Sequence, residues 1–308
     1  MKVLLSKIIY FLIISLAFLG FINSPTALVL GFVFTLIFNN PIKKYSHTAI
    51  NYFLKISVVG LGFGMLIKET LQTSKDGFGL TVFSIFLTVS MGLLLTRLLK
   101  VNLKLGHLIT SGTAICGGSA IAAISPVIKA KPKTISIAIG IVFLLNAIAL
   151  FVFPVLGHLL QLTQYEFGLW CAVAIHDTSS VVGAALSYGD EALRIATTVK
   201  LSRTLWIIPL SIFSMIIFKT KGKKIKIPYF ILLFIVAIIL NSYHVLPVSA
   251  TSFIVLMAKR LLIATLFLVG TTISVKELKS YGMKPVLLAF LLWLLISVSS
   301  LVYILNIK

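Results

Sequence analysis

Long apolar runs, separated by short polar stretches, fill most of the chain. An α-helix needs about 20 mostly apolar residues to cross the hydrocarbon core of a bilayer, and ordinary spans are predicted wherever a run approaches that length. Nine runs do so, at about 8–22, 26–39, 49–67, 77–99, 134–157, 193–218, 227–243, 250–274 and 285–306. The pattern predicts an all-α polytopic membrane protein.

Two further apolar runs, at about 105–129 and 166–188, are interrupted in their middles by glycine and polar residues. The interruptions are Cys116-Gly117-Gly118-Ser119 and His176-Asp177-Thr178-Ser179-Ser180. Irregular backbone at membrane depth is tolerated only where protein buries it or where it lines a wet cavity. We therefore expect a single integral membrane domain over 1–308, with about 9 to 11 transmembrane segments, two of them discontinuous or re-entrant.

The composition supports this interpretation and excludes a separate soluble catalytic domain. Hydrophobic residues make up 59% of the chain and charged residues 11%, with a mean hydropathy of +1.12. Lys and Arg number 27 against 7 Asp and Glu, a formal charge of +20. In a soluble chain this excess would indicate nucleic acid, but in a polytopic protein it sets topology and faces anionic lipid headgroups. We expect no nucleic-acid partner.

The loop lysines predict a cytoplasmic N-terminus in the inner, cytoplasmic membrane, because Lys and Arg concentrate in cytoplasmic loops. The first run, with Lys2 and Lys7 at its start, lacks a small-residue cleavage pattern and is interpreted as an uncleaved helix. The three lysines Lys129, Lys131 and Lys133 face the cytoplasm only if both interrupted runs dip into the membrane and return. We favour such re-entrant hairpins, and crossing broken helices are the alternative.

A short internal match suggests an inverted repeat. The segment from Gly62 to Glu69 can be laid on the segment from Gly270 to Glu277, with a glycine and a Lys-Glu pair in register. Under the predicted topology the two helices run in opposite directions. Inverted repeats, with substrate held by discontinuous helices near the midplane, are a common plan of secondary transporters.

The first interruption has the features of an anion site. Adjacent glycines permit a turn, and a helix restarting near Ser119 would direct free N–H groups and a positive dipole end at a ligand. Thr113 and Ser119 can add hydroxyl donors to Gly117 and Gly118. Close packing of helices through small residues is the alternative.

The second interruption places two ionisable groups and three hydroxyls, those of Thr178, Ser179 and Ser180, in apolar sequence. Ionisable residues inside a membrane are functional candidates. Asp177 is a residue type that caps helix N-termini. His176 could carry a proton during transport, or it could hold the hairpin by hydrogen bonds.

Charged and polar residues inside other runs complete the candidate list. Lys200 and Arg203, three positions apart, could snorkel to headgroups or turn inward as counter-charges for Asp177 or an anion. For Lys259 and Arg260 we expect snorkelling or a salt bridge. We expect Asn146 to bond between helices. The two cysteines, Cys116 and Cys171, lie in apolar sequence without metal-ligand spacing, so we expect no metal, cofactor or disulfide.

These motifs resemble the YeiH-type family of proposed sulfate exporters. The resemblance rests on the segments 112–123 and 174–184 and on Thr198-Val199-Lys200-Leu201-Ser202-Arg203, and their order and spacing cover most of the chain. It implies an inner-membrane anion transporter related to cation/proton antiporters, with a homodimer as the expected assembly. The positions it implicates are Gly117, Gly118, Ser119, His176, Asp177, Lys200 and Arg203. Ser179 and Ser180 depart from the family pattern, which expects a small residue and a glutamine.

The resulting hypothesis is a secondary transporter of a small anion, sulfate or sulfonate-like, working by alternating access. Hydroxyls and helix ends near the two interruptions would bind the anion, Lys200 and Arg203 would supply positive charge, and His176 and Asp177 would couple H⁺ or Na⁺. A cation/proton antiporter using Asp177 and Lys200 is the first alternative. An intramembrane enzyme using His176, Asp177 and Ser179 or Ser180, and a membrane protein without transport, are the others.

Overall fold

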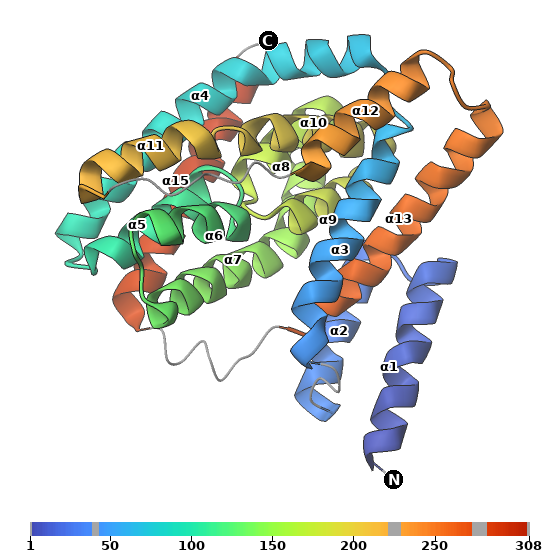
Figure 1. Cartoon of the computed structure of the whole chain (residues 1–308), viewed down its shortest axis with the longest axis horizontal. Helices are drawn as coiled ribbons and strands as arrows, with labels where there is room; N and C mark the ends of the chain where they lie inside the picture. The colour runs from blue at the N-terminus through green and yellow to red at the C-terminus, as the bar shows by residue number, and fades with distance from the viewer. Residues whose placement is uncertain (1, 39–42, 221–228, 273–281, 307–308) are drawn as a thin grey trace.

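A computed structural model describes residues 2–38, 43–220, 229–272 and 282–306, and they fold into α-helices joined by short connections (Figure 1). The helices are α1 Lys2–Leu19, α2 Ser24–Phe38, α3 Lys43–Gly62, α4 Ile67–Leu98, α5 Leu103–Ala114, α6 Gly118–Val127, α7 Pro132–Leu159, α8 Gln164–Ala174, α9 Thr178–Tyr188, α10 Asp190–Thr204, α11 Ile207–Phe218, α12 Tyr229–Ser242, α13 Val248–Gly270 and α15 Met283–Leu305.

The helices match the predicted membrane segments. Among the described residues, five helices are long and apolar enough to cross a membrane: α4, α7, the combined α10 and α11, α13 and α15. Shorter apolar helices include α1, α2, α3 and α12. The prediction of an all-α polytopic membrane protein is confirmed, and the run at 193–218 corresponds to two helices interrupted at Leu205 and Trp206.

The helices form two groups that lie side by side (Figure 1). In the first group, α13 packs against α1, α2 and α3, while α12 packs against α3. Here α2 and α13 approach closely, because a Cβ on Gly31 would lie 2.2 Å from the carbonyl oxygen of Phe267. The second group contains α4 to α11 and α15. The groups meet where α9 contacts α2 and α13.

The segment 105–129 is a re-entrant hairpin. Its two arms are α5 and α6, and their outer ends lie together, since Lys104 at the start of α5 donates to the carbonyl oxygen of Lys129 after α6, at 3.0 Å. Asn102 begins α5 by accepting hydrogen bonds from the N–H groups of Lys104 and Leu105. The chain therefore returns along α6 to the end at which α5 begins.

The segment 166–188 is a second hairpin, formed by α8 and α9. The Tyr188 hydroxyl at the end of α9 donates to the carbonyl oxygen of Leu162 before α8, at 2.6 Å, and its ring stacks on Phe167 with centroids 3.8 Å apart. Thr163 and Glu166 form a capping box that begins α8. The 28-residue helix α7 leads from the open end of the first hairpin to that of the second, so the two hairpins enter from opposite sides.

A long helix followed by a helical hairpin occurs twice, as α4–α5–α6 and as α7–α8–α9. At a spacing of 61 residues, Lys100 and Gln161 both have φ of 53°. The next residues close the same helix ending, because Val101 N–H bonds to the Thr96 carbonyl and Leu162 N–H to the Gly157 carbonyl, each at 3.0 Å. The predicted match between Gly62–Glu69 and 270–277 runs into 273–277, which lie outside the described residues.

Candidate functional site

The tips of the two hairpins touch inside the second helix group. A Cβ added to Gly117 would lie 3.3 Å from the Cα of Asp177. The arms contain 10 to 12 residues, so each reaches about 15–18 Å, half the thickness of a bilayer core. Gly117 has φ of +55° and ψ of −120°, a conformation that side chains rarely adopt, and a Cβ there would make a tight contact with Asp177. The two interruptions thus form one locus.

Lys200 and Arg203 turn inward from α10 and hold the first arm of each hairpin. Both side chains are fully buried. Lys200 Nζ donates to the carbonyl oxygens of Ala172 and Ile175 at 3.2 and 2.8 Å, at the end of α8. Arg203 donates from Nε and Nη2 to the Ala114 carbonyl oxygen at 2.9 and 2.6 Å, at the end of α5. They therefore do not snorkel.

These bonds have a clear electrostatic reason. The last carbonyls of a helix have no partner within the helix and carry the negative end of its dipole. At the tips, α5 and α8 present these ends in the protein interior, where water cannot satisfy them. The two cations do so, and the carbonyls in turn stabilise two buried charges.

The tip of the second hairpin is tied to α7 through Asn146. Asn146 is buried, and its Oδ1 accepts hydrogen bonds from the N–H groups of His176 and Asp177 at 2.9 and 3.2 Å. This confirms the prediction that Asn146 bonds between helices. Asp177 caps α9, as its residue type suggests, by accepting bonds from both the N–H and the hydroxyl of Ser179.

Several buried polar atoms around the locus have no hydrogen-bond partner within the described part of the chain. They are Thr113 Oγ1, Asn146 Nδ2, both ring nitrogens of His176, Thr198 Oγ1 and Arg203 Nη1. Of the two interpretations for His176, its ring therefore does not hold the hairpin by hydrogen bonds. Donors are in excess here, which is the arrangement that receives an acceptor-rich ligand.

Exposure differs sharply among the predicted site residues. Thr113, Gly117, Thr178, Ser179 and Ser180 are buried. Ser119 is exposed, and Gly118 and Asp177 are partly exposed. The accessible part of the locus is thus the start of α6 together with the Asp177 carboxylate.

The two hairpin tips can be aligned residue by residue at a spacing of 60 positions. Ala114-Ile115 corresponds to Ala174-Ile175, and Ser119 corresponds to Ser179. Gly117 then corresponds to Asp177. The start of α9 is capped by a carboxylate bound to a serine, whereas the start of α6 has the serine, no side-chain cap and no carboxylate.

Sequence reasoning missed the main-chain partners of the two cations. Carbonyl oxygens carry no residue signature, but Ala114 and Ile175 directly precede the breaks, where unpaired carbonyls are expected. Lys259 forms the predicted salt bridge, with Asp190 at 2.6 Å. Cys116 and Cys171 are buried free thiols, as predicted. Within the described ranges, no group of three or more His, Cys, Asp or Glu could hold a metal ion.

Comparisons with known proteins place the chain in a family. A family model described as conserved hypothetical protein 698 matches residues 3–289. A UPF0324 membrane protein of Photobacterium profundum is 50% identical over 300 residues, covering 97% of this chain and 92% of the relative. Those of Bacteroides thetaiotaomicron and Porphyromonas gingivalis are 47% and 46% identical, each covering 94% of this chain and 88% of the relative. No solved structure matches significantly. The chain therefore belongs to the UPF0324 family of membrane proteins.

Proposed function

We propose that this protein is a secondary transporter that moves a small anion across the cytoplasmic membrane by alternating access, without chemical conversion of the solute. Sulfate or a sulfonate-like solute is the substrate class. The relatives' names state only that they are membrane proteins. The resemblance of the tip motifs to YeiH-type proteins supports sulfate as the first anion to test, and with it a homodimer with its N-terminus in the cytoplasm.

The asymmetry between the two hairpin tips carries the proposal. At the start of α9, the Asp177 carboxylate receives hydrogen bonds from the N–H and hydroxyl of Ser179. At the start of α6, Ser119 is exposed, and the position equivalent to Asp177 is Gly117, which has no carboxylate. A free oxyanion bound to α6 would occupy the place that the side chain of Asp177 occupies on α9. The Ser119 N–H donates to the Cys116 carbonyl oxygen at 3.3 Å, so the anion would bind the exposed Ser119 hydroxyl at the positive dipole end of α6.

The two buried cations favour an anion over a cation at this locus. Lys200 and Arg203 are two buried basic side chains at this locus, and Asp177 is the acid at the tips. A buried basic group is costly at membrane depth even when carbonyl oxygens accept its hydrogen bonds, so it is retained where a pathway or a ligand uses it. In this proposal the two cations offset the negative dipole ends of α5 and α8. The electrostatic potential at the start of α6, where the anion binds, is then positive.

The hairpins also suit alternating access. They enter from opposite sides and meet at half depth. Movement of the surrounding helices could therefore expose a solute bound at the tips first to one side of the membrane and then to the other. We assign His176 and Asp177 to coupling with H⁺ or Na⁺, because the His176 ring has no hydrogen-bond partner in the described chain and the Asp177 carboxylate is partly exposed.

The test is uptake of radiolabelled sulfate into proteoliposomes, with and without an imposed pH gradient. We expect uptake above empty liposomes that Ser119→Ala and Lys200→Ala reduce at least tenfold, while Asp177→Asn removes the response to the gradient. The matched control is Ser125→Ala, because Ser125 lies on the same helix but bonds to its own helix at the Ile121 carbonyl. Equal uptake by Ser119→Ala and Ser125→Ala would contradict the proposed site.

The same vesicles separate the alternatives. Proton movement driven by Na⁺, without flux of sulfate, sulfonates or other anions, would favour the antiporter that uses Asp177 and Lys200. An enzyme would turn over a substrate without any flux. Against that reading, the Ser179 hydroxyl donates to Asp177 and the His176 ring accepts no bond from it, so the serine is not paired with the histidine.

A further inference from the structure

Two adjoining cavities lie near the open end of the α8–α9 hairpin, and the smaller of them lies between the helix groups. The larger has a volume of 420 Å³ and is lined by residues of α12, of α13 and of the connections next to them, such as Asn241, His244 and Ser252. The smaller, of 150 Å³, lies between α13 and α10 and is lined by Arg194 and Thr197. Gly64, Val255 and Lys259 line both, so the cavities adjoin.

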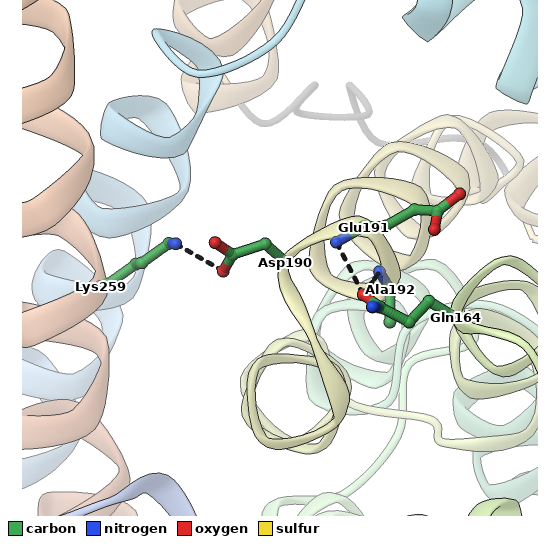
Figure 2. Close-up of polar contacts among 5 residues, drawn as sticks. All are labelled: Gln164, Asp190, Glu191, Ala192 and Lys259. Carbon is green, nitrogen blue, oxygen red and sulfur yellow. Dashed lines mark hydrogen bonds and ion pairs between the residues drawn. The ribbon is translucent and has the colours of Figure 1, made fainter.

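The smaller cavity has the chemistry of an anion site. Arg194 is exposed and has no ion-pair partner among the described residues. Thr197 is 1% exposed, and its hydroxyl has no hydrogen-bond partner in that part of the chain. Lys259 reaches from α13 to Asp190 on α10, as Figure 2 shows. Two cations and one acid leave a net positive charge around an unsatisfied hydroxyl.

The position of Lys259 indicates that water and ions reach this cavity. It is the twelfth of the 23 residues of α13, at the middle of the helix. Lys259 nevertheless lies level with the open end of the α8–α9 hairpin, where α10 begins. Its partner Asp190 has a side chain that is 75% exposed, so the ion pair can exchange with a solute.

The start of α10 does not itself supply the site. The N–H groups of Glu191 and Ala192 have no acceptor within α10, and they donate to Oε1 of Gln164 at 3.0 and 3.4 Å (Figure 2). The neighbouring helix α8 thus already satisfies them. What remains for a ligand is the side-chain set of Arg194, Thr197 and Lys259.

We propose that the smaller cavity is an anion-binding vestibule, separate from the hairpin tips, in which Arg194, Thr197 and Lys259 bind a small oxyanion that displaces Asp190. A cavity of about 150 Å³ holds a molecule as large as benzene, so a sulfate or sulfonate group fits. The choice of anion rests on the proposed function. Thr197 is three positions before Lys200 on α10, so the vestibule leads along this helix toward the tips.

Charged thiol reagents test the vestibule without measuring transport. The probe is Thr197→Cys in a background where Cys116 and Cys171 are alanine, treated in detergent with an anionic and a cationic methanethiosulfonate. The control is Ser187→Cys, at an exposed position near the end of α9. We expect the anionic reagent to be favoured at position 197 by about tenfold relative to position 187, because positive surroundings concentrate anions. Arg194→Gln should abolish this preference, and sulfate should slow the modification.

Transport kinetics supply the second readout. Arg194→Gln and Thr197→Val should raise the KM for sulfate about fivefold and leave the maximal rate unchanged, because they weaken capture and leave the tips intact. Substitutions at the tips should lower the maximal rate instead.

The outcomes separate this proposal from the proposed function. Protection of position 197 by sulfate, without uptake by the unmodified protein, would support the vestibule and refute sulfate transport. Normal uptake with an unchanged KM in Arg194→Gln, and no charge preference at position 197, would overturn the vestibule and leave transport standing. A cysteine at position 197 that reacts with neither reagent would also overturn the vestibule.

Discussion

Asn146 provides the sharpest test of how the second hairpin is held. Asn146→Ala removes the acceptor of two buried N–H groups, those of His176 and Asp177. Hydrogen bonds between helices in membranes contribute about 0.6 to 1.7 kcal/mol each, so the loss should be about 1–3 kcal/mol. Because these bonds hold the tip, the cost should appear mainly as opening of the hairpin.

The assay is alkylation of Cys171, which is fully buried in α8, in a background where Cys116 is alanine. When reclosing is faster than labelling, the rate follows the population of the open form. A loss of about 1–3 kcal/mol raises that population about 5- to 150-fold, and the labelling rate should rise equally.

The matched control is Asn241→Ala. Asn241 also bonds outside its own helix, with Nδ2 donating to the Met65 carbonyl at 3.0 Å, but it lies in the other helix group. It should leave the labelling of Cys171 unchanged. Labelling of Asn146→Ala within twofold of the unmodified protein, or an equal rise in both variants, would refute the reasoning.

Three further predictions concern other contacts. Gly117→Ala should lower the free energy of unfolding by about 1–3 kcal/mol in detergent denaturation, because its φ is +55°, whereas Gly79→Ala, facing a single contact at 3.0 Å, should not. Tyr188→Phe should cost about 0.5–1.5 kcal/mol in the same assay by removing the bond that closes the second hairpin. Asp190→Asn should change stability by less than about 1 kcal/mol, because its pair with Lys259 is exposed, and a larger loss would show that the pair holds the helix groups together.

The two hairpins show where sequence reasoning was sufficient and where it reached its limit. Apolar length located the helices, and the glycines and polar residues located both breaks. Re-entrant hairpins could only be favoured over crossing helices, because the same residues are compatible with either path. The bonds from Lys104 to Lys129 and from Tyr188 to Leu162 decide between them, and both join residues 25 or 26 positions apart in the chain.

The amino-acid sequence alone determined that the chain belongs in a membrane, because transfer of apolar residues into lipid depends on composition and run length. It also marked Lys200 and Arg203, since charge in an apolar run is conspicuous. Only the tertiary structure decided what these side chains touch, because their partners are carbonyl oxygens that every residue carries. It also paired Gly117 with Asp177, a relationship that appears only when two hairpins of opposite orientation meet at their tips.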